Sequence, residues 1–315
     1  MTPADAAEAR SRGYALLAGL WLEGLTPARL AAVRQTPLAA ALPETVDLDE
    51  LAAAHHTAWT LEVLPYAGVF LDTEDTLGGA AQRLLTDCEA AGFSPKTRDT
   101  RADHIGLVLG ALSFLSGAEA DARQDDRGGV ATQLAALQAG LLDRHALSWL
   151  PPLWVAGRSV GGFWAAVLEL TAELLLSHRG AAGEPWALPT LPVGLLEDRK
   201  TSLWRIAGVL ASPALSGVFL TRADLGRIGR AAGVPRGFGA RQQMLANLLR
   251  NAAEYEELPA LLGQLDALWA ERSAAYAALA EVQPVLSGPV QAWRTQAEAI
   301  RVLLSDAVTA VNEKA

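Results

Sequence analysis

Asp103-His-Ile-Gly-Leu-Val-Leu-Gly-Ala-Leu-Ser-Phe-Leu115 is the stretch that decides the fold class of this 315-residue chain. After His104 it is apolar on nearly every face, and a helix that is apolar all round is usually buried on all sides. Asp103 precedes the apolar run, where a side-chain carboxylate can cap the first helical turn. The stretch therefore predicts a central, buried helix with Asp103 as its N-cap.

Helical patterns continue on both sides of this stretch. Alanine and leucine dominate the chain, and both lose little entropy in a helix. An acidic connector is expected at 117–129, and Leu51, Trp59 and Val63 should face inward from a helix over 48–64. The sequence thus predicts an all-α, multi-helix bundle, with helices before residue 180 expected at 7–23, 48–64, 80–92, 103–115, 131–150 and 162–178.

Proline and glycine recur at close intervals around Trp186, which is the strongest linker signal in the chain. We expect a helical domain over 1–180, a linker over 181–196 and a C-terminal helical extension over 197–315. In the extension, Thr221 and Asp224 form a variant of the capping box. The last helix should bury a stripe formed by Val290, Trp293, Ala297, Ile300 and Leu304.

Composition limits the location and the partners of the chain. Its net charge of −9 speaks against a general binder of nucleic acid or acidic membranes. Cys88 is the only cysteine, which fits a reducing compartment without disulfides. Residues 1–12 lack the apolar region of a secretory signal, and no run reaches about 18 uncharged apolar residues. We therefore expect a cytoplasmic protein without stable membrane insertion.

No catalytic constellation stands out among the motifs. The glycine-rich segment 233–239 has neither phosphate-binding spacing and is interpreted as a turn between helices. The five histidines show no H-x-x-x-H spacing. Asp121 and Asp125 suggest half of a Mg²⁺ site, but Arg-Gly-Gly follows Asp126 and no second cluster exists. No catalytic residue, metal or cofactor is expected, so the chain is interpreted as a polypeptide binder and not an enzyme.

One alternative function is binding of DNA by residues 221–249, which resemble a helix-turn-helix. The stretch 197–250 has nine Lys or Arg and three Asp or Glu, and a basic helical pair can follow a phosphate backbone. The next stretch, 251–281, is acidic, so pairing within the protein explains the basic face equally well. A Mg²⁺-dependent helical enzyme built on Asp121 and Asp125 is the second alternative.

The most distinctive pattern is a series of short motifs. It begins with Tyr66-Ala-Gly-Val-Phe70, continues with Asp103-His104 before the apolar helix, and ends with His145-x-x-x-Trp149-x-Pro151 and Phe163-Trp164. In order and spacing, over about residues 10–179, these resemble the TorD/DmsD/NarJ-type redox-enzyme maturation chaperones. The chain departs from that family at Thr100-Arg101, where the family has Glu-Pro, and at 73–79.

The resemblance implies an all-helical, TorD-like bundle that binds the precursor of a molybdenum-cofactor oxidoreductase, or its twin-arginine signal peptide. The client would be held until the cofactor is inserted and the enzyme is exported. Carried over by motif, Tyr66, Val69 and Phe70 would line an apolar groove, and Asp103 and His104 would recognise the client at its rim. The protein would act as a monomer or a homodimer.

Overall fold

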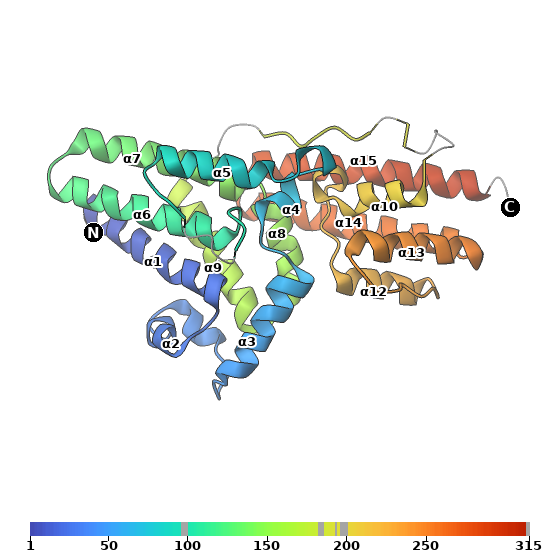
Figure 1. Cartoon of the computed structure of the whole chain (residues 1–315), viewed down its shortest axis with the longest axis horizontal. Coiled ribbons are helices and arrows are strands. Elements are labelled where there is room, and N and C mark those ends of the chain that lie inside the picture. The colour runs from blue at the N-terminus through green and yellow to red at the C-terminus, as the bar shows by residue number, and fades with distance from the viewer. Residues whose placement is uncertain (96–99, 182–185, 193, 196–200, 313–315) are drawn as a thin grey trace. The chain divides into compact units, whose positions relative to one another are not determined.

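The computed structural model describes residues 1–95, 100–181, 186–192, 194–195 and 201–312. In these ranges the chain forms fifteen α-helices joined by short 3-10 and π-helical turns, without a β-strand (Figure 1). The predicted all-α class is confirmed.

The chain divides into two compact units. Unit 1 comprises Met1–Leu150 and Gly157–Glu184, and unit 2 comprises Pro151–Ala156 and Pro185–Ala315. Most of helix α8 (Leu150–Gly157) therefore belongs to unit 2, which the sequence did not indicate, because an apolar run does not tell which neighbour buries it. The predicted domain boundaries stay a prediction, and much of the predicted linker (182–185, 193 and 196) lies outside the described residues.

Unit 1 is built around the predicted central helix. Helix α6 runs along α1 and packs against α7 (Figure 1), and its Val108, Leu112 and Leu115 are fully buried. The inward positions Leu51, Trp59 and Val63 are also buried, as predicted. The helices of this unit are α1 (Pro3–Glu23), α2 (Pro27–Val33), α3 (Leu48–His56), α4 (Ala67–Leu71), α5 (Gly79–Ala90), α6 (Ile105–Gln124), α7 (Gly128–Leu141) and α9 (Gly162–Arg179).

The predicted acidic connector at 117–129 is wrong in its first part, because α6 continues to Gln124. Glu119, which lies within the expected connector, is buried and bonded to Arg10, Arg123 and Gln138. Its charge therefore has partners inside the bundle, and the helix does not need to end. The chain turns only at Asp126, whose φ is 57°.

Two helices predicted as continuous end early in π-helical turns. The expected helix 48–64 ends at His56 and continues as the turn Thr57–Glu62. The expected helix 131–150 ends at Leu141 and continues as Leu142–Leu147. A π-turn inserts a residue without changing the local composition, so hydrophobic periodicity alone does not reveal it.

Helix α6 is the one described helix that is long and apolar enough to cross a membrane by length and composition. Of its most apolar 18-residue window, 67% is buried within the protein. Buried core helices of soluble proteins have the same composition, so this helix is weak evidence for a membrane span.

Unit 2 packs its helices around the antiparallel pair α14 and α15, joined by the turn Pro284–Leu286. The stripe predicted for the last helix is confirmed, since all five of its residues are at most 4% exposed. The predicted capping box of Thr221 and Asp224 is also confirmed. The helices are α10 (Leu203–Ala211), α11 (Pro213–Ser216), α12 (Arg222–Ala231), α13 (Arg241–Glu254), α14 (Leu258–Val282) and α15 (Ser287–Asn312).

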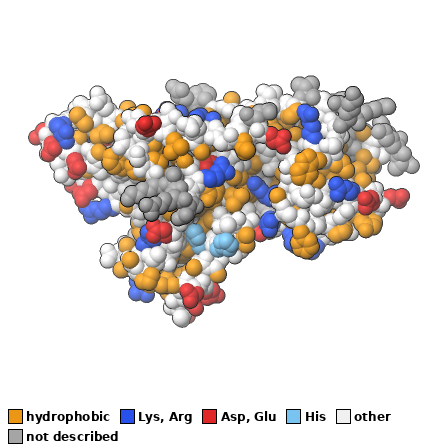
Figure 2. Space-filling model, viewed as in Figure 1, with side chains coloured by type: hydrophobic (Ala, Val, Ile, Leu, Met, Phe, Trp, Pro, Cys, Tyr) orange, Lys and Arg blue, Asp and Glu red, His pale blue; other side chains and the backbone are white. Residues whose placement is uncertain are grey.

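The arginines of the segment 221–249 are largely bonded within unit 2. Arg227 pairs with Asp224 and Glu271, and Arg222 donates to the Gly239 carbonyl. Arg241 lies 4.0 Å over the Phe219 ring, and burial lowers its pKa to about 10. On the face shown in Figure 2, basic and acidic side chains are interspersed. These observations favour pairing within the protein as the explanation of the basic segment.

Candidate functional site

The first two sequence motifs meet through a short antiparallel backbone contact in unit 1. Tyr66 and His104 form an isolated β-bridge. The amide of Ala67 donates to the Asp103 carbonyl at 2.9 Å, and the amide of Ile105 donates to the Pro65 carbonyl at 2.9 Å. This contact holds the start of α4 against the start of α6. We call the residues Tyr66–Phe70 and Arg101–His104 the bridge site.

The predicted N-cap of α6 is wrong by one residue. His104, not Asp103, caps the helix, because its Nδ1 accepts the amide of Gly106 at 3.0 Å. The carboxylate of Asp103 turns away and accepts the amide of Gly68 at 2.7 Å. Because His104 caps the helix, the Asp103 carboxylate is available to bond the amide of Gly68.

Asp103 is fully buried, and its charge has a partner within the site. Arg101 donates from Nε to Oδ1 at 3.2 Å and from Nη2 to Oδ2 at 3.0 Å. Gly68 leaves room for these carboxylates, because an added Cβ would lie 2.8 Å from the Asp103 Oδ2 and 2.7 Å from the Asp72 Oδ2, and both side chains would have to shift. The close approach of Gly68 and Asp103 thus depends on a missing side chain.

Tyr66 forms the partly exposed wall of the bridge site. Its ring meets the His104 ring edge-on at a centroid distance of 4.9 Å. The Arg101 guanidinium lies 5.4 Å from the Tyr66 centroid, within range of a cation–π contact. Burial and the nearby Asp103 charge raise the pKa of Tyr66, so its hydroxyl stays protonated. The site therefore combines the aromatic ring of Tyr66 with the two-bond ion pair of Arg101 and Asp103.

The motif that contains His145 and Trp149 packs against the buried side of the bridge site, at Phe70. Phe70 stacks on Trp149 at a centroid distance of 5.3 Å, and both rings are fully buried. Trp149 Nε1 donates to the His145 carbonyl at 2.7 Å, and the His145 ring pairs with Asp87 at 2.7 Å. Among the five predicted site residues, Phe70 and Asp103 are thus inaccessible, His104 is nearly so, and Tyr66 and Val69 are partly exposed.

Sequence reasoning missed two residues of the site. Arg101 was treated only as a departure from the family pattern, yet it is the partner of Asp103. Asp72 is buried and accepts the amides of Gly78 and Ala80 at 3.0 Å each, and burial raises its pKa. The Gly78-Gly79 turn six residues after Asp72 was a weak signal for the second residue. The sequence held no signal for the first.

Burial keeps His104 neutral, which makes the stability of the protein depend on pH. Burial, followed by the charge of His55, lowers the pKa of His104 to about 4. The unfolded chain takes up the proton near pH 6.5 and the native protein only near pH 4. Stability is therefore fully present above pH 6.5 and is lost as the pH falls toward 4.

Replacing His104 by asparagine, which caps helices but does not titrate, isolates this effect. Between pH 7 and pH 5 the wild type should lose about 2 kcal/mol through His104. His104→Asn should lose correspondingly less, as measured by urea unfolding at both values. The exposed His56→Asn variant is the control. An equal loss in wild type and His104→Asn would contradict this account.

In the part of the chain that the structure describes, no group of three His, Cys, Asp or Glu side chains is arranged to hold a metal ion. Asp125 lies at the end of α6 and pairs with Arg127. The bridge site joins a buried carboxylate, a half-exposed guanidinium and an aromatic ring.

Comparison with known proteins agrees with the motifs. Residues 27–154 match the sequence model of the nitrate reductase delta subunit family, which confirms the resemblance to NarJ/TorD-type chaperones in this part of the chain. Proteins of that family are system-specific chaperones of molybdoenzyme assembly and not enzymes. No curated protein and no solved structure matches the chain. The matched range includes the whole bridge site.

Proposed function

We propose that this chain, whose residues 27–154 match the nitrate reductase delta subunit family, is a cytoplasmic chaperone of a molybdoenzyme. It would bind the enzyme precursor, or its twin-arginine signal peptide, and hold it until the cofactor has been inserted. The observation that carries the proposal is the bridge site within the matched range. There Asp103 and Tyr66 together contact one guanidinium group, that of Arg101.

The contacts of Arg101 indicate which chemical group the bridge site could bind. Its guanidinium forms a two-bond fork with Asp103 and lies on the Tyr66 ring, while half of its side chain remains exposed. An arginine of a client could take the same two partners, because its group is identical. Client binding would then exchange one arginine for another, without leaving the buried carboxylate unpaired, which would be costly.

The other site residues have different roles in this proposal. Val69 and Tyr66, which are partly exposed, would contact the apolar segment that follows the client arginines. Phe70 is buried on Trp149 and would act by positioning α4. His104 would act by capping α6 and by holding the Tyr66 ring.

The proposal predicts opposite effects for two substitutions in one ion pair. Asp103→Asn keeps an acceptor for Gly68 but loses the charge, so it should weaken binding of a twin-arginine peptide about tenfold. Arg101→Ala removes the internal competitor and should tighten binding several-fold. Isothermal calorimetry measures both, with thermal melting of each variant to show that it is folded.

Two controls make this test specific. Arg158→Ala removes another arginine of an exposed ion pair, with Glu169, and should leave affinity unchanged. A twin-lysine peptide should bind more weakly than the twin-arginine peptide, because lysine cannot form the two-bond fork. Equal affinity of wild type and folded Asp103→Asn would refute the site assignment. Co-purification of a molybdoenzyme precursor with the tagged chain would test the client class separately.

A further inference from the structure

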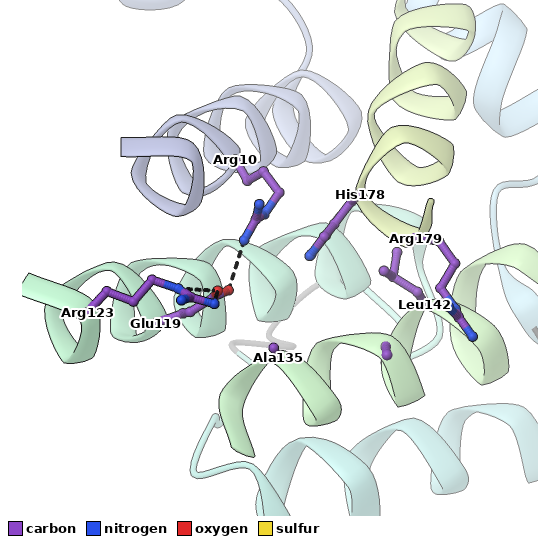
Figure 3. A pocket seen from close by; sticks show the side chains of 8 residues that line it. Arg10, Glu119, Arg123, Ala135, Leu142, His178 and Arg179 are labelled. Atoms are coloured by element: carbon purple, nitrogen blue, oxygen red, sulfur yellow. Dashed lines mark hydrogen bonds and ion pairs between the residues drawn. The ribbon is translucent and has the colours of Figure 1, made fainter. Parts of the chain in front are cut away.

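A polar pocket of about 330 Å³ lies within unit 1, apart from the bridge site, between α1, α6, α7 and α9. Figure 3 shows Arg10, Arg123, His178 and Arg179 around this space, with Ala135 and Leu142 on its apolar side. Neither the family match nor the proposed client binding accounts for it.

The pocket has more positive charge than its carboxylate requires. Three arginines line it, but only one acid, Glu119. Burial raises the pKa of Glu119, but hydrogen bonds from Gln138 and Arg123 and the charge of Arg10 outweigh it and lower the pKa overall. Glu119 is therefore ionised and is satisfied by its neighbours. Asp143, which pairs with Arg179 at 2.8 Å, still leaves the group with one net positive charge.

The two arginines beside Glu119 are incompletely paired and partly exposed. The buried Nε of Arg10 has no partner among the described residues, and the side chains of Arg10 and Arg123 are 24% and 34% exposed. The Tyr14 hydroxyl lies 2.8 Å from Nδ1 of His178. Burial raises the pKa of Tyr14, so the hydroxyl keeps its proton and the two groups share a hydrogen bond.

The orientation of His178 adds a further polar group to the pocket. Burial, followed by the charge of Arg10, lowers the pKa of His178 to about 4, so the ring is neutral. Nδ1 is engaged by Tyr14, which leaves Nε2 for a ligand, and the ring is directed into the pocket (Figure 3).

We propose that this pocket binds a small oxyanion, either free phosphate or the phosphate group of a larger ligand. Guanidinium groups match the oxygen geometry of phosphate and form charge-assisted hydrogen bonds with it. Arg10 and Arg123 would supply positive charge, and His178 would form a hydrogen bond through Nε2. The small side chains of Ala135 and Ala139 on α7 would leave space for the ligand. Glu119 would keep both arginines in place in the empty pocket.

Calorimetric titration with inorganic phosphate, at constant ionic strength set with chloride, tests the proposal. Arg123→Gln should weaken phosphate binding about tenfold, since it removes one charge-assisted contact. Arg158→Gln, a matched loss of charge outside the pocket, should leave the affinity unchanged. Equal weakening in both variants, or no phosphate heat above that of chloride, would overturn the proposal.

A second variant avoids the Glu119 network. Ala139→Glu places a carboxylate on the α7 wall of the pocket, where it can occupy the arginines in place of a ligand, and it should abolish phosphate binding in a folded protein. Undiminished binding to Ala139→Glu would also overturn the proposal. Tighter binding of a phosphate monoester than of phosphate would identify the larger ligand, and the reverse order would identify free phosphate.

Discussion

Gly217→Ala is expected to unfold unit 2 or to lower its stability by about 3–5 kcal/mol. Gly217 ends α11 with a φ of 73°, a conformation that costs alanine energy. An added Cβ would also lie 2.4 Å from the Ala297 amide nitrogen and 2.6 Å from the Trp293 carbonyl oxygen. Both atoms belong to the backbone of α15, so no rotamer change can relieve the clash.

The same contact holds α11 to the central helix pair, which explains why the effect should spread. The Gly217 carbonyl accepts the Tyr276 hydroxyl at 2.9 Å, and the Ser216 carbonyl accepts Trp269 Nε1 at 2.9 Å. Both donors are buried side chains of α14. Moving Gly217 away from α15 would leave these donors unpaired, at a cost for each.

Differential scanning calorimetry and far-UV circular dichroism would measure the loss. Gly263→Ala is a matched control in the same unit, because Gly263 is exposed inside α14 and a Cβ there meets no atom within 4 Å. That variant should gain up to about 1 kcal/mol from helix propensity. An unchanged transition in Gly217→Ala would show that α11 and α15 do not pack this closely in solution.

Trp149→Ala is expected to cost unit 1 about 3–5 kcal/mol, the range for an aromatic side chain lost from a core. The Trp149 ring is fully buried and stacked on Phe70. Its loss would leave a cavity behind α4 and remove the donor to the His145 carbonyl. We also expect the bridge site to loosen, because Phe70 would lose the surface against which it is held.

Urea unfolding followed by circular dichroism would measure this loss without relying on tryptophan fluorescence. Trp149→Phe should cost less than the alanine variant, because it keeps an aromatic partner for Phe70. Trp204→Ala, at a ring that is 48% exposed, should change stability little. A Trp149→Ala loss no larger than that of Trp204→Ala would contradict the central role of this ring.

Much of the bridge site could be predicted, but its internal roles could not. The motifs identified Tyr66, Phe70, Asp103 and His104, and the structure brings these four together. It exchanges the roles of Asp103 and His104, however, since the histidine caps α6 and the acid bonds Gly68. Which of two adjacent polar residues caps a helix depends on what the other one can reach, and that partner is 35 residues away.

The sequence by itself determined the all-α class, the buried course of α6 and the apolar stripe of α15, because helical periodicity is a local property that records which face meets the core. Only the tertiary structure determined which partners the buried charged side chains have. Glu119 lies in the stretch expected as a connector, but it pairs inside the bundle with Arg10, which is 109 residues away. Arg101 had no expected role, and in the structure it is the partner of Asp103. A buried charge is stable only with a partner, and a partner that is distant in sequence leaves no mark on local periodicity.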